Sequence, residues 1–445
     1  MKIAWVLLAA PLCVWGADDG AGRAPLELSL RRAVEIAVSR EGNSNVQLAG
    51  EALKQAQERS LETRASLLPD VESSVTYENR TENLAAMGVQ IKIPAFLGFS
   101  IPEFVGPFNT LDARVTGTQS VFDFSAIQRW RASRVGVMAA RQDVENTGEQ
   151  VAAQVARAYL AAVKADTDVE TAQANVELSQ ALLKQSENEK EAGTGTGIEI
   201  TRAKVQLAND RQRLVEAQNA RRSAHLRLLR AANLRLDTEL KLTDRMGYVP
   251  VDAVTLEQAR AAALAERPDY KAQREREANA RLSATATKME RLPTVAAFGD
   301  YGTVGTGLGN SLPTRTYGIA VRVPLFDGGR RDARRVEAGS QYRAEQVRTN
   351  DLKEQIELDV RLALDALESA DDEVKVAKDG LELAQNELAQ ARRRYDAGVA
   401  TGVEVTDAQT RLERARDNQT GALYNFNVAR IDLAQAMGRV RSVVQ

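Results

Sequence analysis

The chain has 445 residues, and its 59 Lys and Arg residues nearly balance its 61 Asp and Glu residues. A chain that is 44 % apolar is not disordered, and its balanced charge argues against nucleic-acid binding. One Cys and one His exclude an internal disulfide and a multi-histidine metal site, and the sequence holds no phosphate-binding P-loop motif. We therefore expect no cofactor, no metal site and no enzymatic activity.

The first residues resemble an export signal. Lys2 precedes an apolar stretch from Ile3 to Val14, and polar residues begin at Asp18. This pattern predicts a secretory signal peptide over residues 1–16, which is too short to span a bilayer as a helix. The alternative is lipidation of Cys13, which the preceding Ala10-Pro11-Leu12 disfavours because small residues should come directly before a lipidated Cys.

The chain repeats itself once. The segment 191–201 recurs at 396–406, an offset of 205, whereas Leu68-Pro69 recurs at Leu292-Pro293, an offset of 224. The change of offset places about 20 extra residues of the first half within 82–111. We predict a first repeat over 17–233, a connector over 234–254, a second repeat over 255–438 and a tail over 439–445.

Two proline-free windows, 108–249 and 325–445, hold long helical patterns. Each window carries an apolar seam whose spacings alternate between four and three, which is typical of coiled coils. The second seam reads Ile356, Val360, Ala363, Leu367, Ala370, Val374, Ala377, Leu381, Ala384, Leu388, Ala391 and Tyr395. A helix from about Ser125 to Lys190 would be near 100 Å long. Gly-rich turns at 193–197 and 398–402 then reverse the chain, which predicts two long helical hairpins.

Four segments between the helices alternate apolar and polar residues and predict strands. They cover Val71–Glu78, Ala113–Val121, Thr294–Thr303 and Tyr317–Val323, and the third is the weakest because Phe298 and Tyr301 fall on opposite faces. Strands of about 10 residues can cross a membrane when tilted. Because four strands cannot close a barrel, several chains would have to share one; a soluble sheet capping each coiled coil is the alternative.

Taken together, these features resemble the TolC-type outer-membrane efflux family over nearly the whole exported chain. The most specific marks lie at the two turns: Gly193/Gly398, Gly197/Gly402, Glu199/Glu404 and Thr201/Thr406. The resemblance implies a mainly α fold with a β-barrel part. Three chains would form a long α-helical tunnel in the periplasm and share a 12-stranded transmembrane barrel in outer-membrane lipid, each giving four strands.

The function implied by the resemblance is that of a passive exit duct in a tripartite efflux or type I secretion system. Its partners would be a periplasmic adaptor (membrane fusion) protein and an inner-membrane pump, in a bacterium of Gram-negative type. The cargo stays open between drugs, metal ions and a secreted protein. The alternative function is a periplasmic coiled-coil scaffold or adaptor without a pore.

The resemblance also assigns candidate site residues. Glu404 and Asp407 would form the pore constriction, and Glu199 with Tyr395 a possible tip latch. Ala400 stands where some family members have a basic latch residue. The adaptor would contact the tips, which comprise Gly193, Thr194, Gly195, Thr196, Gly197, Gly398, Val399, Ala400, Thr401 and Gly402. Finally, residues 85–111 are apolar enough for an outward loop over the barrel mouth, with a partner-binding loop as the alternative.

Overall fold

The computed structural model describes residues 25–84, 86, 88, 104–193, 195–250 and 254–444. The predictions for the signal peptide, Cys13 and Thr194 lie outside these residues. The chain divides into two compact units. The described residues of the first unit lie within 1–36, 155–247 and 380–424, and those of the second within 37–154, 248–379 and 425–445.

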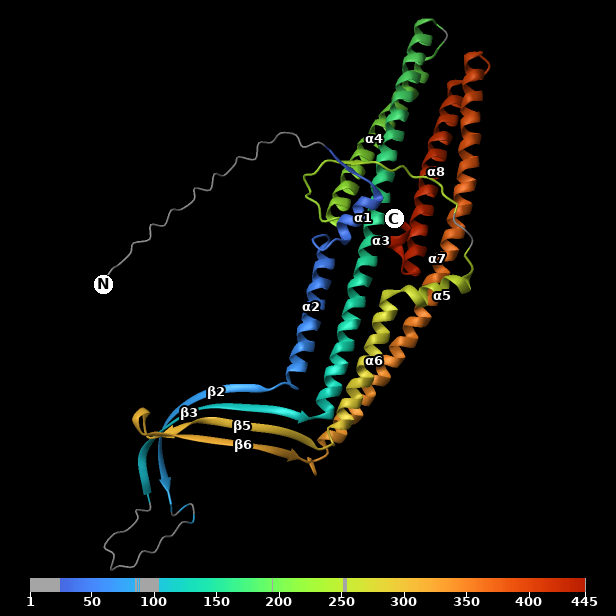
Figure 1. Ribbon diagram of the computed structural model, residues 1–445. Coiled ribbons are helices and arrows are strands. Elements are labelled where there is room, and N and C mark those ends of the chain that lie inside the picture. Colours follow the sequence, from blue (N-terminus) through green and yellow to red (C-terminus); the bar gives the residue numbers. More distant parts are fainter. Residues whose placement is uncertain are drawn as a thin grey trace, which may run out of the picture. The chain divides into compact units, whose positions relative to one another are not determined.

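Helices of similar length recur in the two halves of the chain (Figure 1). The first half contains α1 (Leu30–Val38), α2 (Ser44–Ala65), α3 (Phe124–Glu191) and α4 (Gly197–Ala231). The second half contains α5 (Leu256–Glu266), α6 (Pro268–Met289), α7 (Arg330–Asp396) and α8 (Gly402–Ala436), followed by α9 (Val440–Val444). α2 and α6 are separated by 224 residues, and α4 and α8 by 205, at both their first and last residues.

The first long helix, α3, has the length predicted from the sequence, and α7 is nearly as long. Their seams are buried as expected: Val151, Val155 and Ala162 on α3, and Ile356, Val360 and Ala391 on α7 are at most 3 % exposed. An aspartate precedes each of the two helices. Asp123 accepts a hydrogen bond from the backbone N–H of Ala126, and Asp327 accepts one from the backbone N–H of Arg331. These carboxylates satisfy N–H groups that have no partner within the helix.

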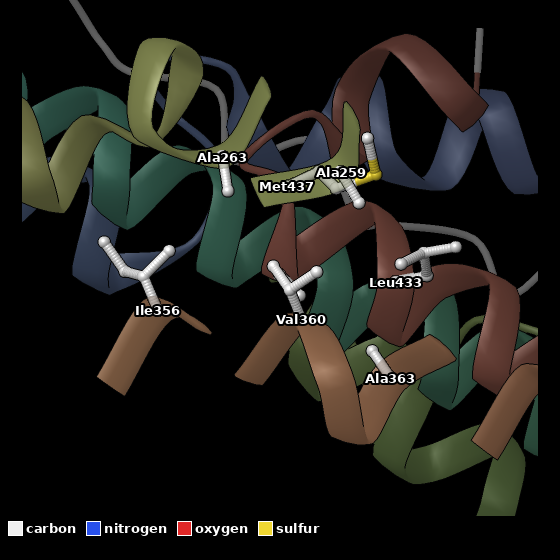
Figure 2. Packing of buried hydrophobic residues seen from close by; sticks show 8 residues of the cluster. Ala259, Ala263, Ile356, Val360, Ala363, Leu433 and Met437 are labelled. Atoms are coloured by element: carbon white, nitrogen blue, oxygen red, sulfur yellow. The ribbon is translucent and has the colours of Figure 1, made fainter. Parts of the chain in front are cut away.

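In the second unit, α5 and the end of α8 pack on the middle of α7. Ala259 and Ala263 of α5 meet Ile356, Val360 and Ala363 of α7 (Figure 2). Leu433, Ala436 and Met437 complete this cluster. The small alanines let the short α5 lie close to α7, and Thr255 holds the start of α5 by accepting the N–H of Gln258.

Four strands of the second unit form one antiparallel sheet in the order β2-β3-β5-β6 (Figure 1). These are β2 (Asp70–Asn83), β3 (Phe104–Phe122), β5 (Thr294–Gly305) and β6 (Ser311–Arg322). The four predicted strands are confirmed, although each is longer than its predicted segment. Among the described residues, no helix is both long and apolar enough to cross a membrane.

The register gives the sheet one apolar and one polar face. Val115 lies opposite Tyr301 and Gly299 opposite Tyr317, which places these side chains on one face, where Val115, Tyr301 and Tyr317 are exposed. The other face carries Arg114, which forms a bidentate ion pair with Asp112. Phe298 also lies on this polar face, where its ring covers the space left by Gly318 on the neighbouring strand. This contact explains how β5 accommodates aromatic residues on opposite faces.

The predicted loop over 85–111 is wrong for its last eight residues, since 104–111 belong to β3. Residues 85, 87 and 89–103 of that loop lie outside the described part of the chain. Pro107 is tolerated within β3 because the pairing with β2 shifts between Arg80 and Glu82. At such a bulge the missing N–H of proline costs no ladder hydrogen bond.

The predicted connector contains a strand that the sequence reading missed. In the first unit, β4 (Leu240–Leu242) pairs in parallel with β1 (Leu26–Leu28). Lys241 and Glu27 lie opposite each other, and their charged groups are 2.8 Å apart. The shared Leu-charge-Leu pattern with opposite charges was the available signal for this pair.

Candidate functional site

The two hairpin turns differ in how they close. At the second turn, Gly398 has a φ of +72°, and the N–H groups of Gly398 and Val399 donate to the carbonyls of Tyr395 and Arg394. This is the Schellman arrangement, which favours glycine at the position of positive φ. At the first turn, Gly193 has a φ of +78°. Gly195 is also required there, since an added Cβ would lie 2.9 Å from the backbone nitrogen of Lys190.

The glutamates after the two turns occupy equivalent positions but have different partners. Glu199 accepts the backbone N–H of Thr196 at 2.9 Å and so caps its own helix, α4. Glu404 forms an ion pair with Arg394 of α7, with Oε1 and Nε 3.1 Å apart. Asp407 lies one turn further along α8 and is exposed. The sequence prediction named both acidic residues but not Arg394.

Tyr395 joins the two hairpins at their tips. Its hydroxyl donates a short hydrogen bond to Glu189 of α3. Burial raises the pKa of Tyr395, and the hydrogen bond to Glu189 raises it further. Glu199, the predicted partner of Tyr395, lines the same cavity but holds its N-cap bond instead. The assignment of Glu199 and Tyr395 as a latch therefore stays a prediction, with Glu189 as an additional partner.

The cavity beneath the turns lies between the two hairpins within the first unit. It has a volume of about 50 Å³ and is lined by residues of all four hairpin helices, among them Ser179, Gln206, Tyr395 and Gln409. The side-chain oxygen Oε1 of Gln409 is buried here without a hydrogen-bond partner from the described residues. A cavity of this size holds a few water molecules, which would satisfy that oxygen.

Apolar side chains hold α7 and α8 together within the second hairpin. Ala384, Leu388 and Ala391 of α7 face Val405, Ala408 and Leu412 of α8, and all six are buried. Thus α8 presents an apolar stripe to α7, which fixes where Glu404 and Asp407 lie on the same helix.

Comparison with known proteins agrees with this architecture. The sequence matches the outer membrane efflux protein family over residues 36–234 and 259–439. It is 24 % identical to the alkaline protease secretion protein AprF of Pseudomonas aeruginosa, over 70 % of this chain and 66 % of AprF. It is 23 % identical to the pyoverdine export outer membrane protein OpmQ of Pseudomonas putida, over 91 % of this chain and 84 % of OpmQ. The chain thus spans just under two thirds of the length of AprF.

A solved structure shows the same fold. The outer membrane channel CmeC of Campylobacter jejuni superposes with a TM-score of 0.78 at 17 % identity, over 92 % of this chain and 85 % of CmeC. The TolC-like fold implied by the family resemblance is therefore confirmed. Because the family match covers most of the sequence, the chain belongs to the outer membrane efflux protein family and is an outer-membrane protein with a helical tunnel in the periplasm.

Proposed function

We propose that three copies of this chain form a passive exit channel in the outer membrane. The observation that carries the proposal is the four-stranded sheet, whose outer strands β2 and β6 each have one edge unpaired within the described chain. Lipid does not tolerate an open sheet edge, so neighbouring chains must cover these edges. The resemblance to TolC-type channels gives the number three, and hence 12 strands.

The cargo would be delivered by a periplasmic adaptor and an inner-membrane pump. AprF is named for the secretion of a protease and OpmQ for the export of pyoverdine, two different cargoes. A duct that leaves the choice of cargo to its pump accounts for both. The matching family is one of outer membrane efflux proteins and not of enzymes, which agrees with transport without a chemical step.

The hairpin tips are the proposed contact with the adaptor. Val399 is 68 % exposed, and the Schellman hydrogen bonds of its turn involve only backbone atoms. Its side chain is therefore available for a partner. Glu404 and Asp407 lie on the same end of α8 and are proposed to line the constriction at this end of the tunnel.

Mass measurement of the protein in mild detergent tests the proposal. We expect a trimer with a circular dichroism spectrum dominated by helix, and discrete conductance steps after insertion into planar bilayers. A monodisperse monomer with the same spectrum would contradict the shared barrel. Release into solution by osmotic shock, without detergent, would favour the periplasmic scaffold.

A further inference from the structure

The two hairpins are joined by a row of polar contacts below the tip. On α8, Gln409, Glu413 and Arg416 follow one another at spacings of four and three and so share one face of the helix. Gln409 Nε2 donates to Ser179 Oγ of α3 at 3.2 Å, and Arg416 donates to Asn175 of α3 at 3.2 Å. Arg213 of α4 donates to Glu413 at 2.7 Å. We call the set Asn175, Ser179, Gln206, Asp210, Arg213, Gln409, Glu413 and Arg416 the polar seam.

The centre of the polar seam is buried although it carries two carboxylates. Asp210 is 1 % exposed and Glu413 is 3 % exposed. Asp210 accepts hydrogen bonds from Ser179 and from Gln206. One guanidinium, that of Arg213, bonds to Glu413 from a position that is more than half exposed. Two buried carboxylates with one partly hydrated cation are costly, because a buried charge needs full compensation.

The coiled-coil repeat does not require this polar seam. At the offset of 205 the counterpart of Ser179 is Ala384, and that of Asp210 is Ala415. The second hairpin therefore packs with alanines where the first carries the polar pair. The buried contact inside the second hairpin consists of apolar side chains. The contact between the hairpins combines the packing of Leu182 with hydrogen bonds that water can replace.

The charges around Glu413 come from three helices. Burial raises the pKa of Glu413, the charge of Asp210 raises it further, and Arg213 opposes both. On the same helix, burial raises the pKa of Asp417; Asp168 of α3 adds to this, whereas Arg213 and Lys164 oppose it. A carboxyl whose pKa is raised while the polar seam is intact binds a proton more tightly in that state than after the two hairpins separate and water surrounds it. Protonation therefore stabilises the intact polar seam, and this stabilisation is lost as the pH rises through the raised pKa.

We propose that the polar seam is a pH-sensitive joint between the two hairpins, which tightens when Glu413 takes up a proton from an acidified periplasm. A neutral Glu413 no longer repels Asp210 and keeps its hydrogen-bond contacts with Arg213 and Gln409. The hairpin tips are then held together more firmly, and the channel conducts less. Only this effect on conductance rests on the proposed channel function.

Amide hydrogen exchange of the detergent-solubilised full chain tests the joint itself. After correction for intrinsic rates, protection of the segment 402–418 should rise several-fold across a pH series that runs from neutral pH down toward the ordinary pKa of a glutamate side chain. Glu413→Gln, which mimics the protonated form, should show high protection throughout the series. Glu387→Gln is the matched control, because Glu387 is an exposed carboxylate of α7 paired with Arg411 and should leave the pH response unchanged.

Two further measurements keep the inference testable. Asp210→Asn removes the negative charge that raises the pKa of Glu413, so the rise in amide protection should move to lower pH. This variant tests the joint even if Glu413→Gln fails to fold. In planar bilayers the wild-type conductance should fall on acidification of the tip side, and that of Glu413→Gln should stay low and independent of pH. An equal pH response in wild type and Glu413→Gln would overturn the joint. A missing conductance with the expected exchange pattern would overturn the channel function and leave the joint supported.

Discussion

Removing Glu404 and Asp407 together tests the placement of the constriction. These residues are three apart on α8, so their Cβ atoms lie about 5–6 Å from each other on one face. With Arg394 paired to Glu404, each chain carries a net charge of −1 at this place. Three chains would therefore give −3, whereas the double variant Glu404→Ala with Asp407→Ala leaves only Arg394, a net charge of +3.

The size of the effect follows from Coulomb's law. A monovalent cation about 6 Å from a unit charge gains roughly 0.7–2.8 kcal/mol for effective dielectric constants between 80 and 20. A trivalent cation gains about three times as much per charge. The wild type should therefore prefer cations and be blocked by a trivalent cation from the tip side. The double variant should lose both properties, and Arg394→Gln should strengthen both because it doubles the net negative charge.

Folding does not confound this test. The side chains of Glu404 and Arg394 are 42 % and 58 % exposed, and an exposed ion pair contributes only about 0–1 kcal/mol. Reversal potentials in planar bilayers measure the selectivity. Glu58→Ala with Glu62→Ala, which removes two exposed carboxylates of α2, is the control. Unchanged selectivity and block in the Glu404 and Asp407 double variant would refute the placement.

Three further predictions concern the tips and the first unit. Val399→Arg should abolish export while the trimer, checked by its mass in detergent, stays intact; undiminished export would leave the tip a structural role alone. Gly195→Ala should destabilise the first turn, which faster amide hydrogen exchange of the segment 185–200 would show. Gly197→Ala, whose Cβ would meet no atom within 4 Å, should leave the exchange unchanged. Tyr159→Phe should cost about 0.5–1.5 kcal/mol of unfolding free energy, because the buried hydroxyl donates to the carbonyl of Leu28 at 2.9 Å; an unchanged denaturation midpoint would contradict that value.

The long helices and strands could be predicted because their signals are periodic. An unbroken apolar seam such as that from Ile356 to Tyr395 specifies one helix and its buried face, and the absence of proline fixes its extent. The short strands β1 and β4 could not be found in this way, since three residues carry no period. Pro107 concealed the first part of β3, because a proline in a strand is acceptable only at a bulge, and the bulge depends on the pairing with β2.

The residues of the candidate site could be predicted only at positions that are equivalent in the two halves of the chain. Glu199 and Glu404 were found as counterparts, but their different partners depend on which side chains lie nearby, Thr196 in one case and Arg394 in the other. The polar seam was missed because its members come from α3, α4 and α8. Within each helix, Ser179, Asp210 and Glu413 look like ordinary polar residues of a coiled coil.

The unequal lengths of the strands would shape the exit of the proposed pore. β3 pairs with β5 only from Leu111 onward, so its first residues, Phe104–Thr110, pair with β2 alone. In the proposed assembly of three chains, the described residues of each β2 and β3 would form a two-stranded ribbon that extends beyond β5 and β6. Molecules that approach the cell surface would meet these ribbons before any other part of the described chain.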